Sequence, residues 1–299
     1  MNRRSDLHGI ALALTGFTFW VFADTSIKLV GSSRLPAYEI IAFLGLFMAL
    51  AVAAYAGARG KLRLLKPHKA VHQAVRSALD LANDICVVIA LRHLSLPLFY
   101  ILVFMAPLVI TVLAAVFLHE KIGLRKALAV LAGFTGVLIA VNPFAATTQG
   151  DWIGYGACMV CVACFSVNMV WSRVLTRTET AESLAFFSGL GMAVVGFGAM
   201  LWHSEPIAER WMVALLAMGF FCAVGSICFF IALKHTTASN VSQYHYTQLL
   251  TGSIVSYLVW RQLPTVGMLL GGVLIVAAGL YIAVLSANNA PLLPRRTGE

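Results

Sequence analysis

Charged residues are scarce in this sequence, and their scarcity decides which solvent surrounds most of the chain. Only 11% of the 299 residues are Asp, Glu, Lys or Arg, whereas 60% are hydrophobic and the mean hydropathy is +0.87. Soluble domains carry about 25% charged residues, so a soluble domain is excluded. The apolar runs are continuous rather than alternating, which predicts an all-α membrane protein and disfavours a β-barrel.

Several chemical signatures are also absent. The sequence has no P-loop and none of the HExxH, GxSxG or GxGD motifs, so ATP hydrolysis and the familiar intramembrane hydrolases are disfavoured. Aspartates paired across different helices, such as Asp24 with Asp80, are the one remaining candidate for an intramembrane enzyme. We therefore expect a protein that is not an enzyme and uses no cofactor.

Cysteine is sparse as well, and its placement argues against disulfides and metals. All six cysteines fall within apolar runs, where buried thiols explain them better than oxidised pairs. Cys158, Cys161 and Cys164 form a CxxCxxC string without an evident fourth ligand, so helix packing is favoured over a metal site. The net charge of +9 comes from basic residues beside helices rather than from a patch, and no nucleic acid partner is expected.

What the sequence has instead is about ten apolar runs, each long enough to cross roughly 30 Å of hydrocarbon as a helix. The expected spans are 8–30, 36–57, 70–92, 95–118, 124–142, 151–174, 182–202, 211–233, 237–260 and 265–286.

The basic residues alternate between the ends of these spans, which predicts the orientation. Short loops rich in Lys and Arg stay in the cytoplasm. With the N-terminus inside, the inner segments hold Arg3, Arg4, Arg59, Lys61, Arg63, Lys66, Lys69, Lys121, Arg125, Lys126, Arg173, Arg177, Lys234, Arg295 and Arg296. The opposite side holds only Lys28, Arg34, Arg92, Arg210 and Arg261. We expect a multi-pass protein of the inner membrane with both termini in the cytoplasm.

An internal repeat divides the chain. Residues 89–94 (IALRHL) match 231–236 (IALKHT), and residues 136–141 (GVLIAV) resemble 279–284 (GLYIAV). The pattern predicts two five-helix repeats, 1–145 and 150–290, followed by a cytoplasmic tail at 291–299. An odd number of spans inverts the second copy, and inverted repeats around a central cavity are typical of secondary transporters.

Two motifs give the repeats a family resemblance. WVFADTSIK (20–28) and FSVNMVWSR (165–173) resemble the Trp-Gly-x-Asn...Lys segment that opens each half of EamA-type exporters in the drug/metabolite transporter superfamily. Trp20, Lys28, Asn168 and Arg173 match that pattern, and Ala23, Phe165 and Met169 depart from it. The proline within the fourth span, Pro107, and the FLHEK ending at 117–121 agree with the family, whereas the second half has Leu249 and Gln262 there.

The resemblance implies a ten-helix bundle with a cavity lined by the first, third, fourth, sixth, eighth and ninth helices. It also implies transport of metabolites, and the YddG-like branch of the family exports aromatic and other neutral amino acids. The favoured function is therefore a secondary transporter that exports such amino acids by alternating access. Other metabolites or cationic drugs remain alternatives, with a proton as a possible coupling ion. The oligomeric state stays open, and a monomer is compatible with the sequence.

The third span carries charges that the bilayer does not tolerate unpaired. Arg76, Asp80 and Asp84 follow one another at helical turns, and their counterparts at an offset of 142 residues are Met218, Cys222 and Ser226. Either Arg76 and Asp80 form a structural ladder, or an aspartate binds a substrate ammonium or a proton. Arg76 cannot pair with both acids, which leaves one of them available for transport.

Other polar residues within the spans complete the candidate site. We expect Trp20, Asn83 and Asn168 to bind substrate, while Asp24 pairs with Lys28 one turn later in a gating or structural role. In SQYHYTQ (242–248), Gln243 and Tyr246 share a helical face with Thr247, and Tyr244 and His245 point elsewhere.

In that segment, the candidate ligands of the substrate are Gln243, Tyr244, His245 and Tyr246, and interhelical hydrogen bonding is the alternative role. Arg76, Pro107 and Glu120 are expected to act in gating or structure, Pro107 because it frees a carbonyl in its helix.

Overall fold

The computed structural model describes residues 3–106, 108–109, 124–141, 151–235, 241 and 244–288, and every regular element in them is a helix. The first half contains α1 (Arg3–Gly31), α2 (Ala37–Ala58), α3 (Ala70–His93), α4 (Leu96–Val103) and α6 (Leu124–Val141). The second half contains α7 (Trp152–Leu175), α8 (Ala181–Met200), α9 (Met212–His235), α11 (Thr247–Trp260) and α12 (Val266–Asn288). Short 3-10 helices, η1 (Leu62–Leu65) and η2 (Glu209–Trp211), precede α3 and α9.

The helices follow the hydropathy of the sequence. The predicted spans 70–92 and 151–174 correspond to α3 and α7 to within one residue at each end. In the part of the chain that the structure describes, α1, α2, α7, α8 and α9 are long and apolar enough to cross a membrane. The expectation of an all-α membrane protein is confirmed.

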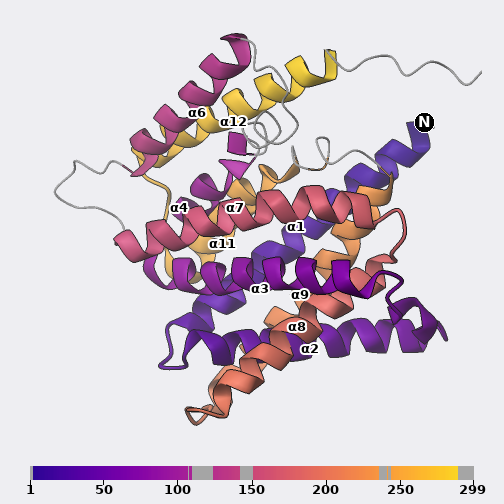
Figure 1. Cartoon of the computed structure of the whole chain (residues 1–299). Coiled ribbons are helices and arrows are strands. Elements are labelled where there is room, and N and C mark those ends of the chain that lie inside the picture. The colour runs from indigo at the N-terminus through magenta and orange to yellow at the C-terminus, as the bar shows by residue number, and fades with distance from the viewer. Residues whose placement is uncertain are drawn as a thin grey trace, which may run out of the picture.

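Helix pairing follows the symmetry of a repeated unit. α1 packs on α9 and α3 packs on α7, whereas α2 pairs with α8, α4 with α11 and α6 with α12. Exchanging the two five-helix units turns the first pair into the second and leaves the other three pairs unchanged. Figure 1 shows the pair α6 and α12 at the top and α2 and α8 at the bottom, with the remaining helices between them. The two repeats therefore interlock around the middle of the bundle.

Glycines allow the paired helices to approach closely. A Cβ atom on Gly189 of α8 would lie 2.8 Å from the Gly45 carbonyl oxygen of α2, and one on Gly136 of α6 would lie 2.8 Å from the Gly271 carbonyl oxygen of α12. Apolar burial drives helix association weakly in lipid, so close backbone packing at small residues stabilises such pairs.

One end of the bundle collects the start of α1, the end of α9 and the connection from α2 to α3. The rings of His8 and His235 lie 5.4 Å apart. The buried carboxylate of Glu179, just before α8, accepts hydrogen bonds from the backbone N–H groups of His68 (2.9 Å) and Lys69 (2.7 Å). This end carries the basic segments that the sequence assigns to the cytoplasm.

The opposite end is held by a second set of contacts between the halves. Glu39, buried at the start of α2, accepts from the backbone N–H of Glu205 at 2.7 Å. Asp151 caps α7 by accepting from the Gly154 N–H at 2.9 Å, and its other oxygen lies 2.6 Å from Nδ1 of His93 at the end of α3. The ends of the helices thus alternate between two faces, as spanning helices require.

Candidate functional site

A cavity of about 120 Å³ lies where the two halves meet, between α1, α3, α4, α7, α9 and α11, with side chains of α2 and α8 completing its wall. Most of its lining is aliphatic or aromatic. Its carboxylate, amide, hydroxyl and imidazole groups belong to Asp24, Asp80, Asn83, Asp84, Tyr100, Asn168, Ser172, Ser188, Ser226, His245 and Gln248. A mostly apolar cavity with a few convergent polar groups is the usual form of a small-molecule site.

Arg76 is fully buried beside this cavity and forms the predicted pair with Asp80. Its Nη1 lies 2.6 Å from Oδ2 of Asp80, while Nη2 donates to the Leu184 carbonyl (2.6 Å) and to Oγ of Ser188 (2.7 Å). The guanidinium also lies over the Phe230 ring, 5.3 Å from its centroid. These partners offset the desolvation of the two terminal nitrogens, whereas Nε has no hydrogen-bond partner among the described residues.

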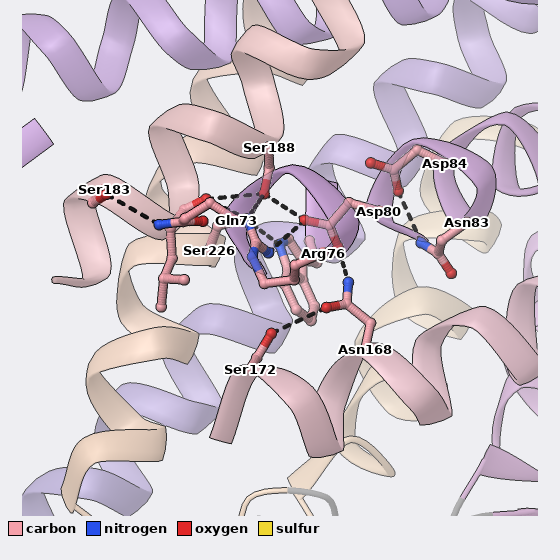
Figure 2. Close-up of polar contacts among 12 residues, drawn as sticks. Gln73, Arg76, Asp80, Asn83, Asp84, Asn168, Ser172, Ser183, Ser188 and Ser226 are labelled. Carbon is pink, nitrogen blue, oxygen red and sulfur yellow. Dashed lines mark hydrogen bonds and ion pairs between the residues drawn. The ribbon is translucent and has the colours of Figure 1, made fainter. Parts of the chain in front are cut away.

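Asp80 completes the network and joins three helices. Asn168 of α7 donates to one carboxylate oxygen and Ser188 of α8 to the other, while Ser172 donates to the Asn168 amide oxygen at 3.1 Å. Figure 2 shows these contacts converging on Asp80 from α7 and α8. Asp80 and Asn168 therefore bind each other as well as facing the cavity.

Asp84 lies one turn further along α3 and has a different environment. Its Oδ1 accepts from the Asn83 amide at 2.9 Å, and the Asn83 oxygen in turn accepts from Sγ of Cys161 at 3.2 Å. In Figure 2 this pair stands apart from the Arg76 network. Among the described residues no lysine or arginine forms an ion pair with Asp84.

Asp24 on α1 faces the same cavity but does not pair with Lys28, so that expectation is wrong. Asp24 accepts from the Tyr100 hydroxyl at 2.9 Å, whereas Lys28 Nζ donates to the carbonyls of Leu91 (2.7 Å) and Leu94 (2.6 Å) at the end of α3. The long lysine side chain reaches the unpaired carbonyls of a neighbouring helix end, which attract a cation. Among the described residues, Asp24 also forms no hydrogen bond with Asp80.

Trp20 lies in an aromatic cluster on one wall of the cavity. Its Nε1 lies 3.4 Å from Oγ of Ser226, and its ring lies 4.9 Å from that of Phe229 and 6.4 Å from that of Phe165. The tryptophan therefore contributes an apolar surface, and its indole N–H is bonded to the second half.

Of the candidate ligands in the 242–248 cluster, His245 faces the cavity, whereas Tyr244 and Tyr246 do not line it. His245 and Gln248 line it, and the His245 ring stacks on Phe17 at 4.7 Å. Tyr246 is not part of the lining and packs against Phe104, 5.2 Å away.

The reason is local geometry. Residues 245 and 246 form a turn before α11 begins at Thr247, so the uninterrupted helix that the sequence predicts does not continue through these two residues. Tyr244 is likewise absent from the lining. Gln243, Pro107 and Glu120 lie outside the described residues.

Sequence reasoning missed Tyr100, Ser188 and Gln248. Tyr100 and Ser188 are lone polar residues in apolar spans, whereas Gln248 ends the polar segment 242–248. Their partners on other helices decide their importance, and helix pairing is not visible in a single sequence.

The interlocked repeats and the central cavity between them define a membrane protein of the small-molecule transporter class. The model of the EamA-like transporter family matches residues 7–142 and again residues 152–284, and the chain belongs to this family.

Named relatives agree with the class and differ in what they carry. The pseudopaline exporter of Pseudomonas aeruginosa is 26% identical, over 92% of this chain and 95% of its own. The S-adenosylmethionine uptake transporter of Rickettsia bellii is 24% identical over 87% of each chain. A riboflavin transporter of Brucella anthropi is 24% identical over 81% of this chain and 87% of its own.

The fold itself has been solved before. One crystal structure, 17% identical in sequence, matches with a TM-score of 0.67 and covers 93% of this chain and 98% of its own. The relatives include none named as an exporter of aromatic or neutral amino acids, so the family is shown and its amino acid branch is not.

Proposed function

We propose that the protein is a secondary transporter that exports small organic metabolites by alternating access, with the central cavity as the substrate site. The main support is that both repeats line one central cavity, with α1, α3 and α4 from the first repeat and α7, α9 and α11 from the second. Rocking one repeat against the other would expose such a site to each side in turn. The two matches of the family model support repeats bounded at 1–145 and 150–290.

Aromatic and other neutral amino acids are the substrates we favour, with other metabolites and cationic drugs as alternatives. Trp20, Phe99 and Phe165 offer aromatic surface, and the acidic lining suits an amino group. The relatives' names widen this choice, because S-adenosylmethionine is itself an amino acid derivative whereas riboflavin is not. A proton is one candidate coupling ion, and exchange and facilitated transport are the alternatives.

A flux screen tests the function. Purified protein in proteoliposomes should carry at least one member of a panel of amino acids, nucleosides and cationic drugs, with saturation and competition. Trp20→Ala and Asn168→Ala should lower that flux with insertion unchanged. Flux no greater than in empty liposomes across the whole panel would rule out this function.

The orientation is a separate proposal: both termini and the 58–69 connection face the cytoplasm of an inner-membrane protein. The basic residues support it through the positive-inside rule. A thiol placed at Lys66 should resist an impermeant reagent in intact cells, whereas one at Trp202, which is 95% exposed near the opposite face, should react. The reverse labelling pattern would invert the topology.

A further inference from the structure

We propose, building on the transport function above, that Asp24 and Asp84 form a cation subsite in the cavity and that the substrate carries an organic cation, such as an ammonium group. Asp80 then belongs to the scaffold. This assignment separates three carboxylates that look alike in the sequence.

The hydrogen bonds distinguish Asp80 from Asp24 and Asp84. Asp80 accepts from Arg76, Asn168 and Ser188 and is neutralised by the guanidinium. Asp84 accepts only from Asn83, and Asp24 only from Tyr100, among the hydrogen bonds of the described residues. Both donors are uncharged, so these two carboxylates keep acceptor positions for a further partner.

The charge of the lining points the same way. Three aspartates line the cavity, and no lysine or arginine of the described residues does. The ammonium of Lys28, the basic residue nearest to Asp24 along α1, donates its hydrogen bonds to carbonyls at the end of α3. Asp24 and Asp84 both line this cavity, and two anions in one low-dielectric site are unfavourable unless a cation or a proton neutralises them.

A third acceptor supports a donor-rich ligand independently of the acids. Gln248 is 2% exposed and lines the cavity, and its Nε2 donates to the Phe17 carbonyl at 3.2 Å. Its Oε1 forms no hydrogen bond of normal geometry, although the imidazole of His245 lies close enough to interact with it. A buried acceptor that is only loosely bonded is unfavourable, and an N–H of a bound ligand would satisfy it better.

The aromatic side chains in the wall suit the rest of such a molecule. Trp20, Phe99 and Phe165 line the cavity together with the two acids. Aromatic faces attract cations and also cover apolar groups. An amine attached to an apolar or aromatic body therefore matches the lining better than an anion does.

Matched probes test the subsite by binding to the full-length protein in detergent, read as a ligand-induced rise in Tm. L-phenylalaninamide is compared with its neutral N-acetyl derivative, and S-adenosylmethionine with neutral 5′-methylthioadenosine. We expect each cation to bind at least about 10-fold more tightly than its neutral match, since hydrogen bonds to charged groups contribute that much or more. Equal affinity within both pairs would overturn the subsite, whatever the variants show.

Variants then locate the charge. Asp24→Asn and Asp84→Asn should each weaken cation binding about 10-fold to 100-fold and leave the neutral probes unchanged. Glu209→Gln, which removes an exposed carboxylate away from the cavity, is the charge control. If Asp84→Asn weakens cationic and neutral probes equally, or removes only the pH dependence of flux, the carboxylate serves a proton and the proposal fails.

The two proposals fail in different ways. Charge-selective binding without flux in proteoliposomes would remove the transport function and keep the subsite. Saturable flux with no preference for cations, and with Asp24→Asn and Asp84→Asn at the parental rate, would remove the subsite and keep the transport function.

Discussion

The two halves of the molecule agree where they hold helices together and differ where they line the cavity. Lys28 donates to the Leu91 carbonyl at the end of α3, and its counterpart Arg173 donates to the Leu233 carbonyl at the end of α9. Leu91 and Leu233 are themselves equivalent at the repeat offset of 142 residues. The same helix-end contact has therefore been kept in both repeats.

The cavity positions have diverged between the same repeats. Asp24, Asp80 and Asp84 of the first half face the cavity where the second half has Met169, Cys222 and Ser226, and all six side chains line it. The symmetry thus survives in the scaffold, and the acidic chemistry lies on one side. An asymmetric substrate in a nearly symmetric bundle accounts for both facts.

Replacing Arg76 by its second-half counterpart gives the largest effect we expect. Arg76→Met leaves the Asp80 carboxylate without its cation and should destabilise the protein by about 3–5 kcal/mol. The double variant Arg76→Met with Asp80→Cys installs both second-half residues and should recover much of that loss, because removing a whole buried pair costs less than breaking it. Denaturation in detergent measures both, and equal stability of the single variant and the parent would show that the pair is dispensable.

The next prediction concerns the close packing of α2 against α8, the corresponding helices of the two repeats. Gly189→Ala should destabilise by about 1–3 kcal/mol, since the new methyl group meets the α2 backbone and neither helix can yield alone. Gly198→Ala in the same helix is the matched control, because a Cβ there meets nothing within 4 Å. Equal Tm values for the two variants would contradict the described packing.

Glu179 and Glu39, both buried, allow the two opposite ends of the bundle to be compared. Glu179→Gln should cost about 1.5 kcal/mol, because its carboxylate accepts two backbone hydrogen bonds. Glu39→Gln should cost less, because one backbone N–H donates to its carboxylate among the described contacts. Proteolysis of the 58–69 connection should accelerate in Glu179→Gln only, and acceleration in Glu39→Gln instead would reverse the assignment of the two ends.

Asp151, which joins the halves outside the spans, should have the smallest effect and a defined pH dependence. The pKa of Asp151 lies below its usual value of 3.8, chiefly because the Gly154 N–H donates to the carboxylate, with His93 adding to the effect. The folded protein therefore binds this proton more weakly than the unfolded chain, so the stabilisation is complete above the usual pKa and is lost as the pH falls through the lowered one. Asp151→Asn should flatten the stability profile in that acidic range, and an unchanged profile would exclude this role.

The fold was largely predictable, because the apolar runs and the odd number of spans in each repeat can be read from the sequence alone. The runs 36–57 and 151–174 each consist of about twenty mostly apolar residues, and the structure places the helices α2 and α7 there. The Arg76 and Asp80 pair was also predictable, since residues four apart in a helix are neighbours. These inferences use spacing within one element.

The site was less predictable because its partners come from other elements. Lys28 donates to carbonyls at the end of α3 instead of pairing with Asp24, and the Tyr100 hydroxyl of α4 donates to Asp24. Predicting these partners requires knowing how α1, α3 and α4 pack. His245 lies in a turn before α11 and lines the cavity, and nothing in the spacing of the apolar residues indicates that turn. Neither contacts between helices nor a local break in a helix can be predicted from the spacing of residues within one helix.

The most direct test of the account exchanges the diverged residues across the repeats. Asp84→Ser is compared with the double variant Asp84→Ser, Ser226→Asp, at matched Tm, by flux of L-phenylalaninamide into proteoliposomes. The account predicts that both variants lose about 10-fold or more of the parental flux, because Asn83, Asp24 and Tyr100 stay in the first half and the moved carboxylate lacks them. Parental flux in the exchanged variant, or in Asp84→Ser alone, would show that the acidic side of the cavity does not decide what the protein carries.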